Sequence, residues 1–159
     1  MIEYLIGKYL EDEEVVNGNL HYSKRPDTTS LTTTIYSETV PQPDYVQGFN
    51  SDFVGVKFLT RSQVNQEAKK LASDIHKNLS QLGGIEIETT HNIGGVVYDW
   101  KAWIVSVDIV TPPTDLEIDD KGRFVVVSHY SVHAQTEGNK FRKATITEPY
   151  EEEVEEEEP

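Results

Sequence analysis

Two histidines near the C-terminal end of the chain pose the first chemical question. His129 and His133 stand four residues apart, a spacing that lets two imidazoles share one metal ion when it falls on a helix. The segment 123–134 around them is rich in valine and aromatic residues, which is typical of a strand. Four residues of strand at about 3.3 Å each separate the side chains by ~13 Å, too far for one metal. We therefore predict no chelate, but two polar residues on the less buried face of a strand, beside Val125, Val127 and Ser131.

Acidic residues just before this strand suggest oxygen ligands for calcium. A calcium loop beginning at Asp115 would need a glycine at its sixth position and a glutamate at its twelfth. The sequence has Asp120 and Val126 there, so the loop fails both tests. The letters DDKG at 119–122 instead predict a hairpin turn in which Gly122 takes a positive φ.

Other catalytic chemistry has little support in the sequence. The chain has no cysteine, which excludes disulfides, thiolate zinc sites and cysteine nucleophiles. The motifs GxSxG, GxGxxG and HExxH and the Walker loop are absent as well. We expect a protein that is not an enzyme, with no catalytic residue, metal or cofactor. A hydrolase with a dispersed site is the alternative, and it would need a deep pocket lined by His91 or His129 with acids.

Charge is distributed unevenly along the 159 residues. The net charge is −14, and eight of the 28 acids lie in the segment 148–159. Without that segment 20 acids face 14 lysines and arginines, a balance of −6. The body therefore offers no basic stripe for phosphates, and nucleic-acid binding is disfavoured. We predict a single domain over 1–147 and a solvated acidic tail over 148–159.

Neither a membrane nor export is indicated by the sequence. No apolar run approaches the roughly 20 residues that span a bilayer. The first residues also lack the basic start and small-residue cleavage site of a signal peptide. We expect synthesis in the cytoplasm.

Hydrophobic periodicity predicts strands around one prominent helix. A short N-terminal helix, strands at 31–40 and 52–61, and a polar loop at 41–51 come first. An apolar stripe then marks a helix that ends at Gly83, formed by Val64, Ala68, Leu71, Ala72, Ile75, Leu79 and Leu82. A further strand should bury Trp103, Val105, Val107 and Ile109 and end at Pro112-Pro113. The predicted fold class is α+β, a largely antiparallel sheet packed against one long helix and the short N-terminal helix.

The order of these features resembles the tail terminator or minor capsid proteins of long-tailed, siphovirus-type bacteriophages. The resemblance runs from about residue 1 to 134, and the acidic tail lies outside it. It rests on the N-terminal helix, the strand DFVGVKFLTR ending on Arg61, the helix NQEAKKLASDIHKNL, and the Pro-Pro segment that leads to IDDKGRFVVVSHYSV.

The resemblance implies a structural virion protein at the head–tail junction. Such a subunit forms a homo-oligomeric ring, typically a hexamer, which caps the tail tube and meets a head-completion or neck protein. DNA would be only passing cargo, and an acidic lumen would let it slide through without sticking. A neck protein of the same junction and an acidic binding module acting through its polyglutamate tail remain alternatives.

Candidate contact residues follow from aromatic residues in predicted loops and from charge. Tyr45, Val46 and Phe49 in the long loop and Trp100 near a glycine-rich ribbon are candidate interface anchors. Each can equally tuck onto its own core. Arg61 and Arg123 can contact acidic neighbouring subunits, although pairs with acids of the same chain are the favoured interpretation.

Overall fold

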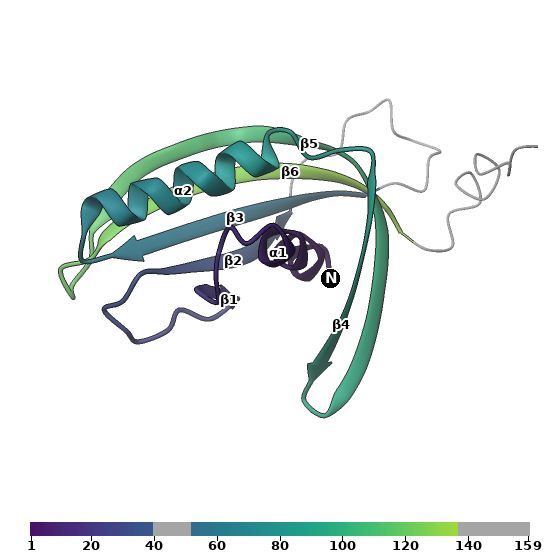
Figure 1. Cartoon of the computed structure of the whole chain (residues 1–159), viewed down its shortest axis with the longest axis horizontal. Coiled ribbons are helices and arrows are strands. Elements are labelled where there is room, and N and C mark those ends of the chain that lie inside the picture. The colour runs from purple at the N-terminus through teal and green to yellow at the C-terminus, as the bar shows by residue number, and fades with distance from the viewer. Residues whose placement is uncertain (40–51, 137–159) are drawn as a thin grey trace, which may run out of the picture.

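The computed structural model describes residues 1–39 and 52–136. It is one six-stranded sheet in the order β1-β2-β3-β6-β5-β4, with two helices (Figure 1). The elements in chain order are α1 (Ile2–Asp12), β1 (Leu20–Tyr22), β2 (Thr32–Thr39), β3 (Asp52–Ser62), α2 (Asn65–Leu79), β4 (Ile85–Ile93), β5 (Val96–Ile118) and β6 (Phe124–Thr136). The strand pair β1 and β2 is parallel and the other four pairs are antiparallel, so the sheet is mixed.

The predicted fold class is wrong in its balance. The expected α+β domain had one long helix packed on a largely antiparallel sheet, but the structure is mainly sheet with two short helices. Helix α2 has 15 residues and α1 has 11, whereas β5 alone has 23. The apolar stripe overstated the length of α2, because the first and last residues of the stripe, Val64 and Leu82, lie outside the helix.

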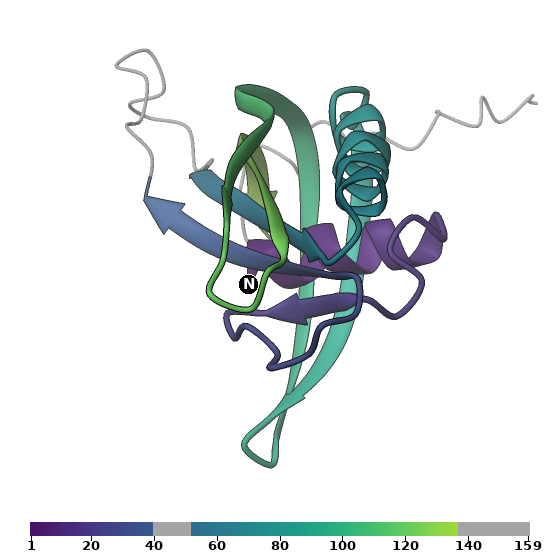
Figure 2. The ribbon, with the colours of Figure 1, turned by 90° about the vertical axis from the view of Figure 1, so that its left-hand side faces the viewer.

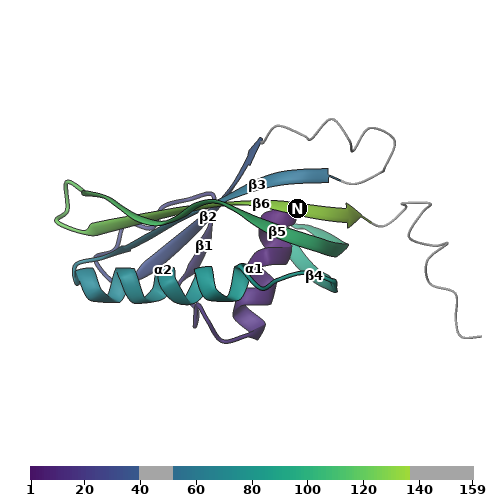
Figure 3. The same cartoon turned by 90° about the horizontal axis from the view of Figure 1, so that it is seen from above.

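Both helices lie on one face of the sheet, which Figure 3 shows from above. The strands alternate as predicted: Val56 and Phe58 of β3 and Tyr130 and Val132 of β6 are buried toward the helices. From α1, three side chains with no exposed surface enter the same core, Leu5, Ile6 and Leu10. This is the helix face; the opposite side of the sheet is called the back face below.

Helix α2 begins and ends differently from the prediction. The Ser62 hydroxyl accepts the Val64 N–H at 3.0 Å, but Val64 is half exposed and does not belong to the apolar stripe. At the other end Gly84, and not Gly83, has the positive φ of 68°. Gly83 is needed for space, because an added Cβ would lie 2.8 Å from the carbonyl oxygen of Val105.

The prediction for residues 102–113 is wrong about most of the buried residues of β5 and about where the strand ends. Its buried residues are Ala102, Ile104 and Val107, and Ile109 is exposed. A register shift between Ile104 and Ser106 moves the buried face by one residue, which a strict alternation cannot foresee. The strand also passes through Pro112-Pro113 instead of ending there, since both prolines fall in a shift where β6 has no partner for them.

The turn between β5 and β6 confirms the reading of DDKG. Gly122 has φ 73° and donates its N–H to the Asp119 carbonyl at 2.9 Å. His129 and His133 lie on the back face of β6, as predicted. The His133 ring stacks on Phe53 with 4.3 Å between centroids, and burial lowers its pKa against the opposing pull of Asp108.

The parallel pair β1 and β2 requires a connection that crosses the sheet. Residues 23–30, which we call the strap, make it (Figure 2). Thr28 of the strap accepts a hydrogen bond from Arg123, and Arg25 donates to the Tyr36 hydroxyl at 3.2 Å. The strap therefore lies against side chains of the back face.

Candidate assembly interface

The β4–β5 hairpin projects from the body of the molecule (Figure 1). Nine residues of β4 pair with Val96–Ile104 of β5. Its turn is Gly94-Gly95, whose φ values of 61° and 85° suit the two-residue turn that continues the strand twist. Asn92 closes the turn by accepting the Gly95 N–H at 3.0 Å.

The tip of this hairpin is apolar and exposed. Val96 and Val97 are 53% and 60% exposed. Ile93, which pairs with Val96, and Tyr98 are exposed as well. We call these four residues the hairpin tip. Four neighbouring apolar side chains in water on a projecting strand pair are typical of a surface that meets another chain.

Stacked rings fix the base of the hairpin to the body. The Tyr4 ring of α1 lies 4.5 Å from His91 and 4.9 Å from Trp100, measured between centroids. Tyr22 of β1 stacks on Tyr4 at 4.5 Å, and burial raises the pKa of its hydroxyl. Tyr98 extends the cluster by stacking on Trp100 at 5.4 Å. The direction of the hairpin is therefore set by this aromatic cluster, while its tip stays exposed.

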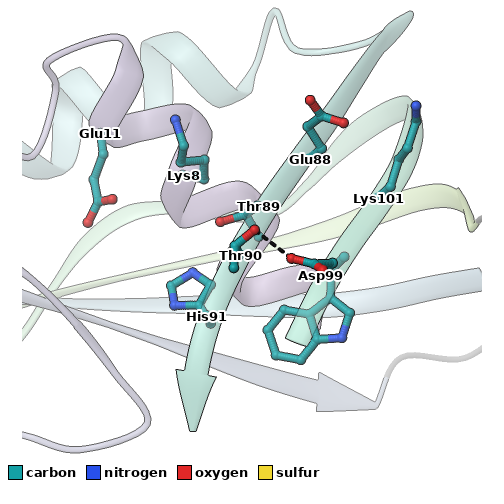
Figure 4. A pocket seen from close by; sticks show the side chains of 9 residues that line it. Lys8, Glu11, Glu88, Thr89, Thr90, His91, Asp99 and Lys101 are labelled. Atoms are coloured by element: carbon teal, nitrogen blue, oxygen red, sulfur yellow. Dashed lines mark hydrogen bonds between the residues drawn. The ribbon is translucent and has the colours of Figure 1, made fainter. Parts of the chain in front are cut away.

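An open pocket of about 810 Å³ lies beside the aromatic cluster, between α1 and the hairpin (Figure 4). His91 lines it together with the acids Glu11, Glu88 and Asp99, which is the lining that the hydrolase alternative requires, although the pocket is open and not deep. Asp99 accepts a hydrogen bond from Thr90 at 2.6 Å. Thr89 and Thr90 supply the hydroxyl groups of the pocket, and no described hydrogen bond joins either of them to His91.

A second exposed apolar surface follows the far half of β5. Strand β4 pairs with β5 only as far as Ile104. Beyond it β6 pairs with one side of β5, and no described strand covers the other. Four apolar side chains there are exposed, namely Ile109, Val110, Leu116 and Ile118. We call this stretch the β5 edge; unpaired strand edges are ready templates for contact with another chain.

The residues predicted from the sequence do not form one surface. Tyr45, Val46 and Phe49, and the acidic tail, lie outside the described residues. Trp100 is partly buried at the base of the hairpin, so it positions the hairpin tip and is not itself the tip. The structure brings Arg61 and Arg123 together, but both are buried on the back face, at 3% and 4% exposure.

Arg123 makes the intrachain pair that was the favoured interpretation. Its Nε and Nη2 each lie 2.7 Å from Oδ2 of Asp119, and its backbone N–H bonds Oδ1 at 3.0 Å. Burial raises the pKa of Asp119, but these hydrogen bonds outweigh it and the pKa falls below its ordinary value. Arg61 makes no described ion pair, although the charge of Asp119 acts on it, and its Nε and Nη2 are buried without a described hydrogen-bond partner.

Both apolar surfaces were missed by sequence reasoning. The letters IGGVVY contain the signal for the hairpin tip, because three apolar residues directly after a Gly-Gly turn cannot all face one core. For the β5 edge the signal was weaker, since Pro112-Pro113 was read as a strand end. Within residues 1–39 and 52–136 no three His, Asp or Glu gather as a metal site.

No helix in the described part of the chain is long and apolar enough to cross a membrane. No model of a known protein family matches the chain, and no curated protein matches it.

Proposed function

We propose that the protein is a structural virion protein, a ring-forming tail terminator that caps the tail tube of a long-tailed phage and joins it to the head or neck. One observation carries the proposal: the hairpin tip and the β5 edge are two different exposed apolar surfaces of one chain. The order of elements that resembles this family supports it as well. No catalytic step is part of the proposed role.

Two unlike surfaces on one chain favour head-to-tail assembly. If the hairpin tip of one copy packs on the β5 edge of the next, every subunit uses both surfaces once. Such heterologous contacts close into a ring when the rotation between neighbours divides a full turn. A hexamer is the expected ring, with the tail tube protein on one side and a head-completion or neck protein on the other.

The mass of the purified protein tests the ring. We expect light scattering to give a species near six times 18.0 kDa. The substitution Val97→Asp places a charge in the hairpin tip and should leave monomers. Val64→Asp is the matched control, because Val64 is also an exposed valine but lies at the start of α2. Equal assembly of both variants would contradict the proposed contact.

The place of the ring in the particle needs a separate experiment. Purified tail tubes mixed with the protein should acquire a cap at one end, visible by electron microscopy. Caps on tubes support the terminator, whereas binding to DNA-filled heads in their place would identify a head-completion or neck protein. An acidic binding module would bind neither and would depend on the glutamates of 148–159.

A further inference from the structure

Strand β4 is the last strand of the sheet, and one of its two sides is free. Strand β5 pairs with the other side along all nine residues of β4, and no described strand pairs with the free side. At the opposite end of the sheet β1 has only three residues, and the β5 edge is interrupted by Pro112-Pro113. Strand β4 contains no proline. Its free side is therefore the longest uninterrupted strand edge of the described sheet, and such an edge presents a row of unpaired N–H and C=O groups.

Helix α1 borders this edge, and a groove runs between the two (Figure 4). The open pocket of about 810 Å³ forms one half of the groove, and a second pocket of about 680 Å³ forms the other. Lys8 of α1 and Glu88 of β4 line both pockets, so the two are continuous. Together they are lined by every β4 residue from 85 to 91. We call this surface the β4 groove; an extended chain lying in it has the strand edge on one side and α1 on the other.

The β4 groove carries an excess of negative charge. Its two lysines are already paired with acids of the same groove, Lys8 with Asp12 and Lys101 with Glu86 at 2.7 Å. Three further glutamates of the groove are exposed and make no ion pair in the described part of the chain, namely Glu11, Glu13 and Glu88. A positively charged chain would therefore be attracted to the free edge.

The side chains of β4 determine which residues of an added strand meet these acids. Glu86, Glu88 and Thr90 are exposed on one face of β4, whereas Ile87 and Thr89 are buried on the other. Successive side chains of an added strand alternate between the same two faces. Lysine or arginine beside the glutamates, alternating with apolar residues on the buried face, is the pattern that fits.

Charge also excludes this chain itself as the occupant. A second copy that paired antiparallel about Ile87 would set Glu86 of one copy opposite Glu88 of the other, and like charges directly opposite destabilise a strand pair. The segment 148–159, with its eight glutamates, would be repelled in the same way. The β4 groove is suited to a different protein.

We propose that the β4 groove is a peptide-binding site, in which an extended segment of a partner protein, with lysine or arginine at alternate positions, adds a strand to the free side of β4. Backbone hydrogen bonds to β4 supply part of the affinity, and the acids of the groove select a basic segment. The site is separate from the hairpin tip and from the β5 edge, so it goes beyond the proposed ring.

Binding of a basic peptide tests the charge of the groove. The probe is a labelled peptide of nine residues, the length of β4, in which lysine alternates with valine. The acidic segment 148–159 would also attract this peptide, so the receptor is the full chain with the eight glutamates of that segment changed to glutamine. We expect Glu11→Gln combined with Glu88→Gln to weaken binding at low salt by about tenfold. Glu117→Gln combined with Asp120→Asn is the matched control, because it removes two exposed acids outside the groove.

Hydrogen exchange tests whether the peptide binds as a strand. An added strand should slow the exchange of alternate β4 amides, those whose N–H points away from β5, by about tenfold or more. The amides of β1 and of the β5 edge should not change. Two further peptides, N-methylated at the lysines or at the valines, should differ, because only one of these sets of N–H groups faces β4 in an added strand.

The measurements separate this site from simple attraction between charges. Equal weakening by the groove variant and its control, or equal binding of a peptide with glutamate in place of lysine, would overturn the choice of a basic occupant. Peptide binding that leaves the exchange of β4 amides unchanged, or that both N-methylated peptides retain, would overturn strand addition.

The site and the ring can fail independently. The groove variant keeps the hairpin tip and the β5 edge intact, so light scattering should give the same mass for it as for the native chain. A native chain that forms no ring would reject the proposed function and leave the peptide results unaffected. Loss of the ring in the groove variant would mean that a second copy occupies the groove, which overturns the choice of a different protein.

Discussion

The two hairpins that share β5 are built in opposite ways. The β5–β6 turn is polar and holds itself together, with Asp119 bonded to Arg123 and the strap laid against it. The β4–β5 turn is a Gly-Gly pair closed by Asn92, and the apolar side chains beside it are exposed to water. A turn that only reverses the chain needs no exposed valines. The difference indicates that the β5–β6 turn is closed by its own contacts, whereas the β4–β5 turn presents a surface for another molecule.

Removing Arg123 from the β5–β6 turn should have the largest effect on the free energy of unfolding. Arg123→Met leaves Asp119 and the Thr28 carbonyl without their donor, and breaking a buried pair in this way costs about 3 kcal/mol. Urea unfolding of the variant and the native chain measures the loss. A change below about 0.5 kcal/mol would mean that the turn does not depend on this pair.

The loss of a ring at the base of the β4–β5 hairpin should have the second-largest effect on stability. Trp100→Ala removes the ring that Tyr4 and Tyr98 contact, and we expect about 2 kcal/mol of destabilisation. The same variant should assemble poorly, because the hairpin loses its fixed direction. Trp100→Phe keeps an aromatic ring and is the control; it should recover most of the stability and the assembly.

Low pH should destabilise the β5–β6 turn, because it contains Asp119, and should leave the apolar β4–β5 hairpin tip unaffected. The pKa of Asp119 is lowered from 3.8 in the folded chain. Its contribution is therefore fully present above about pH 4 and is lost as the pH falls through the folded pKa. At pH 7 we expect Asp119→Asn to cost about 1.5 kcal/mol. Unfolding curves at decreasing pH should show that difference shrinking, and a constant difference would contradict the assignment.

A substitution in the hairpin tip should have the smallest effect on stability but should strongly reduce assembly. Val97→Ser removes an exposed apolar side chain, so the free energy of unfolding should change by less than about 0.5 kcal/mol. Ring formation, measured by light scattering, should fall. A loss of stability without a loss of assembly would reverse the comparison between the two hairpins.

Local patterns in the sequence foretold local structure well. Phe58 and Val56 alternate toward the helices, and DDKG makes the turn that its aspartate and glycine favour. These features depend on neighbours a few residues away. The contact of the strap with Arg123 joins residues 95 positions apart, and no periodicity encodes such a contact.

The misjudged regions have a common physical cause. The register shifts of β5 place Ile109 in water and carry the strand past Pro112. A bulge is set by the partner strand, and so it is invisible in the sequence of one strand. The candidate interface was missed for the same reason, because exposure of the hairpin tip depends on how far β4 and β5 extend beyond the body.

The paired prolines of β5 have a consequence for solubility. An exposed, unbroken strand edge can recruit further strands without limit, which is how cross-β fibrils grow. Pro112 and Pro113 have no N–H to donate, and they fall in the middle of the β5 edge. A partner can therefore cover the apolar side chains on either side of them, but it cannot continue one ladder along the whole strand. The same edge that is open to a partner is thus protected against fibril growth.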